Sequence, residues 1–313
     1  MADDAFDPLT SAGSSDAAVS PILSGLTTLA ANAAPPLADA DFRRVADVLK
    51  RHAGIHLADD KRELVRSRLA KRLRALGYSS YRQYLEDHVV PADRSGQTGG
   101  EFVHFVDVLS TNLTSFYREP AHFDYLRRHV LPGVLARSGG RVRGWCAAAS
   151  TGEEPYCLAM TCLEAAREHG VAKPDVKVLS TDICTKVLAE ASAGVYAEPR
   201  AKAVNPALRG RYWEPRRLPD GMPAIAAGRE LRDACVFRRL NLMDRPPFRG
   251  PLDFIFCRNV MIYFDRPTRE SLVGRLLNVL APGGYLFTGH SESLTGTSHA
   301  LRQVQAAVYQ KPS

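Results

Sequence analysis

The sequence contains no run of 18 consecutive apolar residues, and its start, MADDAFD, is acidic rather than basic. A membrane-spanning helix needs about 20 mostly apolar residues, and a secretory signal peptide opens with a basic region. Neither kind of segment is indicated. The sequence therefore predicts a soluble, cytoplasmic protein that does not insert into membranes.

Paired cysteines are also lacking. The chain has six cysteines, at positions 146, 157, 162, 184, 235 and 257, and no two of them form a CxxC pair. Structural zinc sites and dithiol redox sites usually contain such pairs. Several of the six lie in apolar runs, where a free thiol packs like a small apolar side chain. We expect buried free thiols in a reducing compartment, and no bound metal.

Length and charge limit the remaining possibilities. The chain has 313 residues, of which 45% are hydrophobic, so it can bury a sizeable core and form two domains. Its net charge of +7 favours an acidic partner: nucleic acid, an anionic membrane face or an acidic protein surface. Residues 1–36 are rich in Ala, Ser, Asp and Pro, which predicts a disordered leader.

Residues 37–110 show the periodicity of helices, and we expect a small N-terminal helical domain there. The helix expected over about 59–76 carries seven cations, with few acids beside them: Lys61, Arg62, Arg66, Arg68, Lys71, Arg72 and Arg74. Such a run is either a solvated face or a docking surface. The shortage of acids favours a docking surface for an acidic partner.

The most informative stretch is RVRGWCAAASTGEEPY, residues 141–156. It is typical of a buried strand that turns tightly into a helix, with Gly152 in the turn and Pro155 at the first helical position. A helix N-terminus ordinarily attracts anions such as phosphate. Here Glu153 and Glu154 occupy that position, so they either cap the helix or attract a ligand ammonium or sulfonium.

The remaining pattern alternates between strands and helices, which predicts a doubly wound, mostly parallel sheet over residues 111–313. We expect a linker at 111–137 and a small antiparallel β insert at about 212–240. A second strand, 175–183, contains Asp182 near its end, where it either accepts hydrogen bonds from ribose hydroxyls or caps the next helix. A third strand, 251–257, is followed by Arg258, Asn259 and Tyr263.

Six blocks of this sequence, in order, resemble the chemoreceptor glutamate methyltransferases, the CheR family. The blocks are STNLTSFYRE, WCAAASTGEEPY, LSTDI, NLMD, DFIFCRNVMIYFD and GGYLFTGHSESL. The resemblance implies S-adenosylmethionine as cofactor, with S-adenosylhomocysteine as product. It also implies a helical domain followed by a doubly wound methyltransferase domain with a small β insert, which transfers methyl groups to receptor glutamates in sensory adaptation.

The resemblance also assigns cofactor contacts to positions in this chain: Asn112, Thr114, Arg118, Glu154, Asp182, Asn241, Leu242, Cys257 and Arg258. Glu154 would meet the methionine ammonium and Asp182 the ribose, while Asn241 and Leu242 would border the adenine. Whether Glu153 shares the role of Glu154 stays open.

Three residues are candidates for the transfer step itself. Arg118 or Arg258 would hold the acceptor carboxylate, and Tyr263 would set its angle. The alternative is that Arg258 and Tyr263 only pack or form salt bridges. An ionised carboxylate can attack a sulfonium methyl without a metal or a strong base, so we expect positioning to dominate catalysis.

The resemblance bears on two contacts with the receptor. The basic helix 61–74 would face the methylation helices. In some members of the family the β insert also binds a C-terminal receptor peptide, and whether it does so in this chain stays open. The insert loop EPRRLPDGM contains only Gly221, whereas peptide-binding members have a glycine-rich loop.

Two other functions are compatible with a basic chain that binds adenosine: a nucleic-acid methyltransferase and a non-catalytic cofactor-binding signalling module. The first lacks support, because the sequence has neither an Asn/Asp-Pro-Pro-aromatic motif nor an aromatic-studded basic strand.

Overall fold

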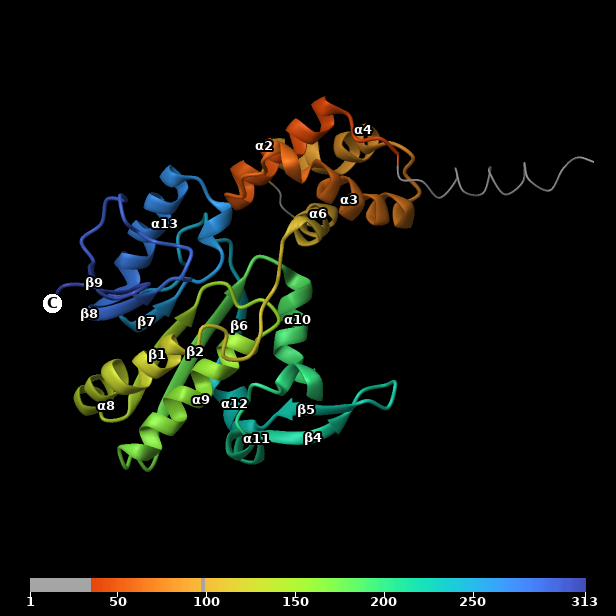
Figure 1. Cartoon of the computed structure of the whole chain (residues 1–313). Coiled ribbons are helices and arrows are strands. Elements are labelled where there is room, and N and C mark those ends of the chain that lie inside the picture. Colours follow the sequence, from red (N-terminus) through yellow and green to blue (C-terminus); the bar gives the residue numbers. More distant parts are fainter. Residues whose placement is uncertain (1–34, 97–98) are drawn as a thin grey trace, which may run out of the picture.

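The structure is a computed structural model that describes residues 35–96 and 99–313. The expected disordered leader, residues 1–36, lies outside the described residues except for Pro35 and Pro36. A helical domain comes first, followed by a domain built on a central sheet. An extended linker runs from one to the other (Figure 1).

The helical domain contains α2 (Asp39–Ala53), η1 (Asp59–Lys61), α3 (Arg62–Leu76), α4 (Tyr81–Tyr84), η2 (Leu85–Val89), α5 (Val90–Ser95) and α6 (Glu101–Leu109). Apolar residues three and four positions apart on α2 and α3 form its core. Leu76, the last residue of α3, is 38% exposed. The helical path continues without a break from α4 through η2 into α5, which begins at Val90 and has Pro91 as its second residue.

The second domain begins with α7 (Ala121–Tyr125), η3 (Leu126–Val130) and α8 (Leu131–Ser138). Its further helical elements are α9 (Glu153–Glu168), α10 (Thr185–Ala193), η4 (Glu198–Ala201), α11 (Pro206–Tyr212), α12 (Arg229–Ala234), η5 (Met261–Tyr263) and α13 (Arg266–Val279). The main sheet consists of β1 (Arg141–Cys146), β2 (Asp175–Asp182), β6 (Cys235–Arg239), β7 (Leu252–Phe256), β8 (Leu280–Phe287), β9 (Arg302–Gln305) and β10 (Val308–Gln310).

The strand order in this sheet is β6-β2-β1-β7-β8-β10-β9. The first five strands are parallel, and β10 pairs antiparallel with both β8 and β9. β9 and β10 are separated by a turn at Ala307, which has a φ of 57°. The prediction of a doubly wound, mostly parallel sheet is confirmed.

Alternate residues of the central strands pack into two separate cores, one on each face of the sheet. On β7, Phe254 and Phe256 join the core with α8 and α9, whereas Ile255 joins the core with α13. A parallel sheet covered on both faces needs such continuously apolar strands. All six cysteines are buried free thiols, as expected.

The β insert differs from the range expected for it, about 212–240. Its antiparallel sheet has the order β3-β5-β4 and consists of β3 (Val195–Ala197), β4 (Trp213–Arg217) and β5 (Pro223–Ala227). The segment 235–239 instead forms β6, which pairs parallel with β2 in the main sheet. The turn signals around Gly221 and Gly228 mark the hairpin and its end, but they do not show which sheet the next strand joins.

No helix in the described part of the chain is long and apolar enough to span a lipid bilayer.

Candidate active site

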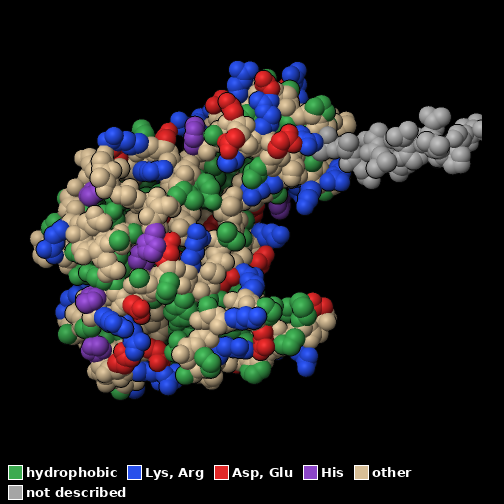
Figure 2. All heavy atoms as spheres, viewed as in Figure 1, with side chains coloured by type: hydrophobic (Ala, Val, Ile, Leu, Met, Phe, Trp, Pro, Cys, Tyr) green, Lys and Arg blue, Asp and Glu red, His purple; other side chains and the backbone are tan. Residues whose placement is uncertain are grey.

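A cavity lies between the two domains, at the carboxyl ends of β1, β2 and β7. Its walls include residues from 53–64 in the helical domain, from the linker 109–118, and from 147–154, 182–183, 240–242 and 258–264 in the sheet domain. Open α/β sheets bind ligands at this end of the strands. Figure 2 shows the molecular surface hollowed between the helical domain and the arm formed by β4 and β5.

Hydrogen bonds hold the helical domain against the rim of this cavity. The His56 amide donates to the carbonyl oxygen of Tyr263 at 2.8 Å, and Asn241 Nδ2 donates to the His52 carbonyl oxygen at 2.5 Å. Farther away, Asp107 on α6 accepts hydrogen bonds from the backbone and hydroxyl of Thr185, at the start of α10. The contribution of the helical domain to the cavity wall was not foreseen from the sequence.

The turn after β1 contains Gly152, as predicted, in a conformation that favours glycine. Gly152 has a φ of 98°, and a Cβ added to it would lie 2.5 Å from the Tyr196 hydroxyl and 2.9 Å from Ala191 Cα. The atoms that exclude a side chain therefore belong to the protein itself. The helix α9 starts at Glu153, two residues earlier than expected, so Pro155 is its third residue.

The structure separates the two adjacent glutamates. Glu153 is buried away from the cavity, where it accepts a hydrogen bond from the Thr151 hydroxyl at 2.7 Å and pairs with Arg200. Glu154 lines the cavity, pairs with Arg258 Nη1 at 2.5 Å and accepts a hydrogen bond from the Cys146 thiol at 3.3 Å. Only Glu154 can meet a ligand in this cavity.

Asp182 also faces the cavity, and it is not the cap of α10. Its two carboxylate oxygens accept hydrogen bonds from the amides of Ser150 at 2.8 Å and Cys184 at 3.0 Å. It thereby ties the turns after β1 and β2 together. Each carboxylate oxygen has a further lone pair, so the group can still accept hydrogen bonds from a ligand.

Both cavity carboxyls are held in surroundings that disfavour their charge. Burial raises the pKa of Glu154, and the charge of Arg258 opposes only part of that effect. Burial also raises the pKa of Asp182, against the backbone hydrogen bonds from Cys184 and Ser150. A cationic ligand group beside Glu154 would relieve this cost, so the site fits a ligand that carries an ammonium group.

Arg258 is completely buried between two carboxylates. Its Nη2 lies 3.0 Å from Glu119 Oε2 and donates to the Arg118 carbonyl oxygen at 2.6 Å, while Nη1 pairs with Glu154. Burial lowers the pKa of Arg258, but the charges of Glu154 and Glu119 outweigh this and raise it overall. Both terminal nitrogens of the guanidinium therefore bind protein groups, whereas the buried Nε has no hydrogen-bond partner among the described residues.

The other expected contacts divide between the cavity and the core. Asn112, Thr114, Arg118, Asn241, Leu242 and Tyr263 line the cavity. Cys257 is buried in the core that packs against α13 and is not among the residues that line the cavity. Its contact with the cofactor stays a prediction.

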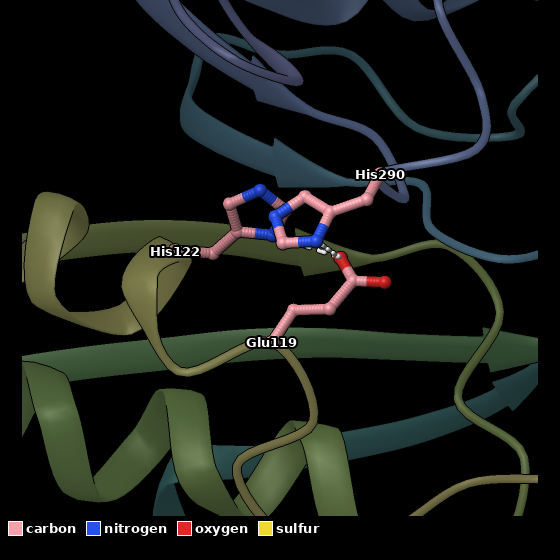
Figure 3. Close-up of side chains that lie close together, drawn as sticks. All are labelled: Glu119, His122 and His290. Carbon is pink, nitrogen blue, oxygen red and sulfur yellow. Dashed lines mark ion pairs between the residues drawn. The ribbon is translucent and has the colours of Figure 1, made fainter.

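Glu119 belongs to a cluster that the sequence did not reveal. Figure 3 shows the rings of His122 and His290 beside its carboxylate, with closest approaches of 3.4 Å and 4.0 Å from their Nδ1 atoms to Oε2. Burial and the charge of Arg258 lower the pKa of His122 to about 4. Two histidines and a carboxylate can hold a transition metal, but the same Oε2 already pairs with Arg258, whose positive charge opposes a bound cation.

More of the positive charges on the basic helix are paired with acidic side chains than the sequence indicated. Four of its seven cations form ion pairs: Lys61 with Asp60, Arg62 with Asp39, Arg66 with Glu63 and Arg72 with Glu101. Arg68 donates to the carbonyl oxygens of Leu109 and Ser110 at the end of α6. Within the described residues, Lys71 and Arg74 are the exposed cations of this helix without an ion pair. Figure 2 shows Asp and Glu side chains among the cations of the helical domain.

Both domains match one family of proteins. Residues 40–110 match the CheR methyltransferase all-alpha domain, and residues 112–310 match the CheR methyltransferase SAM binding domain, where SAM is S-adenosylmethionine. The chain belongs to the CheR methyltransferase family. The resemblance drawn from six sequence blocks is thereby confirmed, and the chain carries the S-adenosylmethionine-binding domain of this family.

Curated relatives align with most of the chain. The probable chemotaxis protein methyltransferase of Rhizobium etli is 42% identical over 260 residues, covering 82% of this chain and 94% of the relative. The chemotaxis protein methyltransferase of Salmonella typhimurium is 41% identical, covering 83% of this chain and 85% of the relative. Chemotaxis protein methyltransferase 2 of Pseudomonas aeruginosa is 42% identical, covering 86% and 92%.

The Gly152→Ala substitution should destabilise the fold by about 2–4 kcal/mol, because a Cβ would meet backbone atoms of Ala191 in a strained left-handed conformation. Urea unfolding measures the change. Gly210→Ala on α11 is the matched control, since a Cβ there meets nothing within 4 Å. Equal unfolding midpoints for the two variants would contradict this account of the turn.

The affinity for S-adenosylmethionine should rise as the pH increases from about 5 to 7, because the raised pKa of Glu154 leaves part of this carboxyl protonated at the lower pH. We expect the ammonium to bind the ionised form of Glu154, so binding should release protons at the acidic end of this range. Calorimetry in buffers of different ionisation enthalpy detects that release. A pH-independent affinity without proton exchange would show that Glu154 does not meet the ammonium.

Proposed function

We propose that this CheR-family enzyme transfers a methyl group from S-adenosylmethionine to glutamate side-chain carboxylates of chemotaxis receptors, forming methyl esters in the cytoplasm. The observation that carries the proposal is a cavity in which Glu154, held by Arg258, and the half-buried Tyr263 face the same space. The names of the relatives support chemoreceptors as the acceptors, and they do not favour nucleic acid or a non-catalytic role.

The residues around the cavity fit the chemical groups of the donor. Glu154 would hold the ammonium and Asp182 the ribose hydroxyls, with Asn241 and Leu242 beside the adenine and Asn112 and Thr114 from the linker. When bound, S-adenosylmethionine supplies a methyl group on a positively charged sulfur, which a carboxylate oxygen can accept directly with S-adenosylhomocysteine as the leaving group. Because carboxylates are ionised at neutral pH, the chain needs neither a metal nor a general base for this step.

Arg118 and Tyr263 are the residues we assign to the acceptor carboxylate. Arg118 lines the cavity and uses Nη1 to bind the Leu113 carbonyl oxygen at 2.8 Å, which steadies the side chain and leaves its other donors available. Arg258 has the different role of holding Glu154 in place. Positioning of two reactants in this way contributes up to about 7–11 kcal/mol to a reaction barrier in favourable cases.

Receptor methylation is tested with radiolabelled S-adenosylmethionine and receptor-containing membranes. Base-labile label on the receptor is expected, because methyl esters hydrolyse in base whereas methylated amines do not. Tyr263→Phe should slow transfer by about tenfold, or ~1.4 kcal/mol, and leave the affinity for S-adenosylhomocysteine nearly unchanged. Base-stable label would contradict the proposed product, and an unaltered rate would remove the Tyr263 hydroxyl from the mechanism.

The surface of α3 that carries Lys71 and Arg74 is the proposed contact with the acidic methylation helices of the receptor. The double variant Lys71→Glu, Arg74→Glu should weaken receptor methylation by about three- to tenfold at low salt, and less at high salt, because exposed charges are screened. Cofactor affinity should not change. The double variant Arg128→Glu, Lys173→Glu is the control for total charge, since both side chains are also exposed and lie on other segments.

Arg68 and Arg72 are less informative positions on the same helix, because these two arginines hold the helical domain together. Equal losses in the α3 double variant and in the control double variant would mean that only net charge matters.

The β insert is the second proposed contact, with a C-terminal receptor peptide. Its edge strand β4 contains Pro215, which has no backbone N–H to donate to an added strand. The hairpin loop closes on itself through the Leu218 amide and the Met222 carbonyl oxygen, at 2.9 Å. Both features weaken the case for this contact relative to α3, and calorimetry with a receptor tail peptide measures it directly.

A further inference from the structure

A buried carboxylate, Glu292, lies behind the cavity wall. It follows β8, is 2% exposed, and forms no ion pair within the described part of the chain. It is not among the residues that line the cavity. A buried charge without a counter-ion is costly unless hydrogen bonds stabilise it. The hydrogen-bond partners of Glu292 therefore indicate its role in the structure.

Glu292 accepts hydrogen bonds from three backbone amides. Its Oε2 is 2.6 Å from the Asn259 nitrogen and 2.6 Å from the Gly289 nitrogen, and its Oε1 is 3.1 Å from the Ile262 nitrogen. Charge-assisted hydrogen bonds of this kind are about twice as strong as neutral ones. Two of the three donors, the amides of Asn259 and Ile262, belong to the loop after β7, which is a strand that pairs with β8.

That loop contains both Arg258 and Tyr263. Its backbone is unusual at Asn259, which has a φ of 58°, in the left-handed region that side chains other than glycine rarely adopt. The loop also packs tightly against the turn after β8: a Cβ on Gly289 would lie 2.6 Å from Asn259 Nδ2 and 2.6 Å from Glu292 Oε2. The carboxylate of Glu292, which is not part of the cavity lining, therefore holds a loop whose Asn259 adopts the left-handed conformation.

We propose that Glu292 is a positioning residue for methyl transfer. It touches neither substrate nor cofactor, but its hydrogen bonds to Asn259 and Ile262 fix the backbone on either side of the turn that presents Arg258 and Tyr263 to the cavity. This inference rests on the proposed function, because it assigns Glu292 to the same reaction.

The test is Glu292→Gln, which keeps the size of the side chain and replaces one acceptor oxygen with an NH₂ group. That NH₂ group would face a backbone N–H, either of Ile262 or of the Asn259 and Gly289 pair. The transfer rate at saturating cofactor should fall by about tenfold or more. The dissociation constant for S-adenosylhomocysteine should change by less than about threefold, because Arg258, which holds Glu154, is also fixed by Glu119 and by the Arg118 carbonyl oxygen.

Glu270→Gln on α13 is the matched control, since Glu270 forms a surface pair with Arg266, and it should behave as the wild type. If Glu292 acts through Tyr263, the effects of the two substitutions on the transfer rate should not be additive. The fold-loss of rate caused by Glu292→Gln should be at least about threefold smaller in the Tyr263→Phe variant than in the wild type. Hydrogen exchange of the Asn259 and Ile262 amides provides a readout independent of activity, and both should exchange faster in Glu292→Gln.

Two results would overturn the inference. One is a wild-type transfer rate in Glu292→Gln with unchanged amide exchange. The other is a parallel loss of rate, cofactor affinity and melting temperature with additive effects of Tyr263→Phe, which would indicate a merely structural role. Failure of the wild type to methylate receptors would contradict the proposed function instead, and the exchange measurement would still report on the loop.

Discussion

The buried arrangement of Arg258 between Glu154 and Glu119 is the interaction on which the site depends. It joins three segments that are distant in sequence: the linker, the start of α9 and the loop after β7. Removing one partner of a buried ion pair costs about 3–5 kcal/mol, because the other charge is left uncompensated. The guanidinium also lies over the rings of Phe123 and Phe256, each 5.7 Å from its centroid, so its position is fixed by packing as well as by charge.

The charges of this arrangement explain why the cavity suits a cationic ligand. The carboxylates of Glu119 and Glu154 share the guanidinium of Arg258, and the pKa values of the two carboxyl groups are shifted in opposite directions. Burial works against the charge of Glu119, but the hydrogen bond and charge of Arg258 prevail and lower its pKa. For Glu154 burial prevails and raises the pKa. The negative charge that remains incompletely paired is thus the one that faces the cavity.

The rest of the architecture keeps these groups in place. The parallel strands end along one edge, so the turns after β1, β2 and β7 meet there, and backbone bonds such as Ala149 to Thr181 at 2.9 Å extend the sheet into those turns. The helical domain closes the opposite side through His52 and His56. A cofactor in this cavity would therefore touch both domains.

Sequence alone determined the fold class and the family, and it named nine of the residues that line the cavity. Hydrophobic periodicity, the strand–turn–helix motif around Gly152 and the six family blocks are local properties that can be read without the tertiary structure. The sequence did not separate Glu153 from Glu154, and it did not single out Glu119 or Glu292. It also overestimated the free charge of α3, since Asp39 and Glu101, which neutralise Arg62 and Arg72, are distant in sequence. These points were decided only by the tertiary structure, because the direction of a side chain and the partner of a charge depend on which distant segments meet in space.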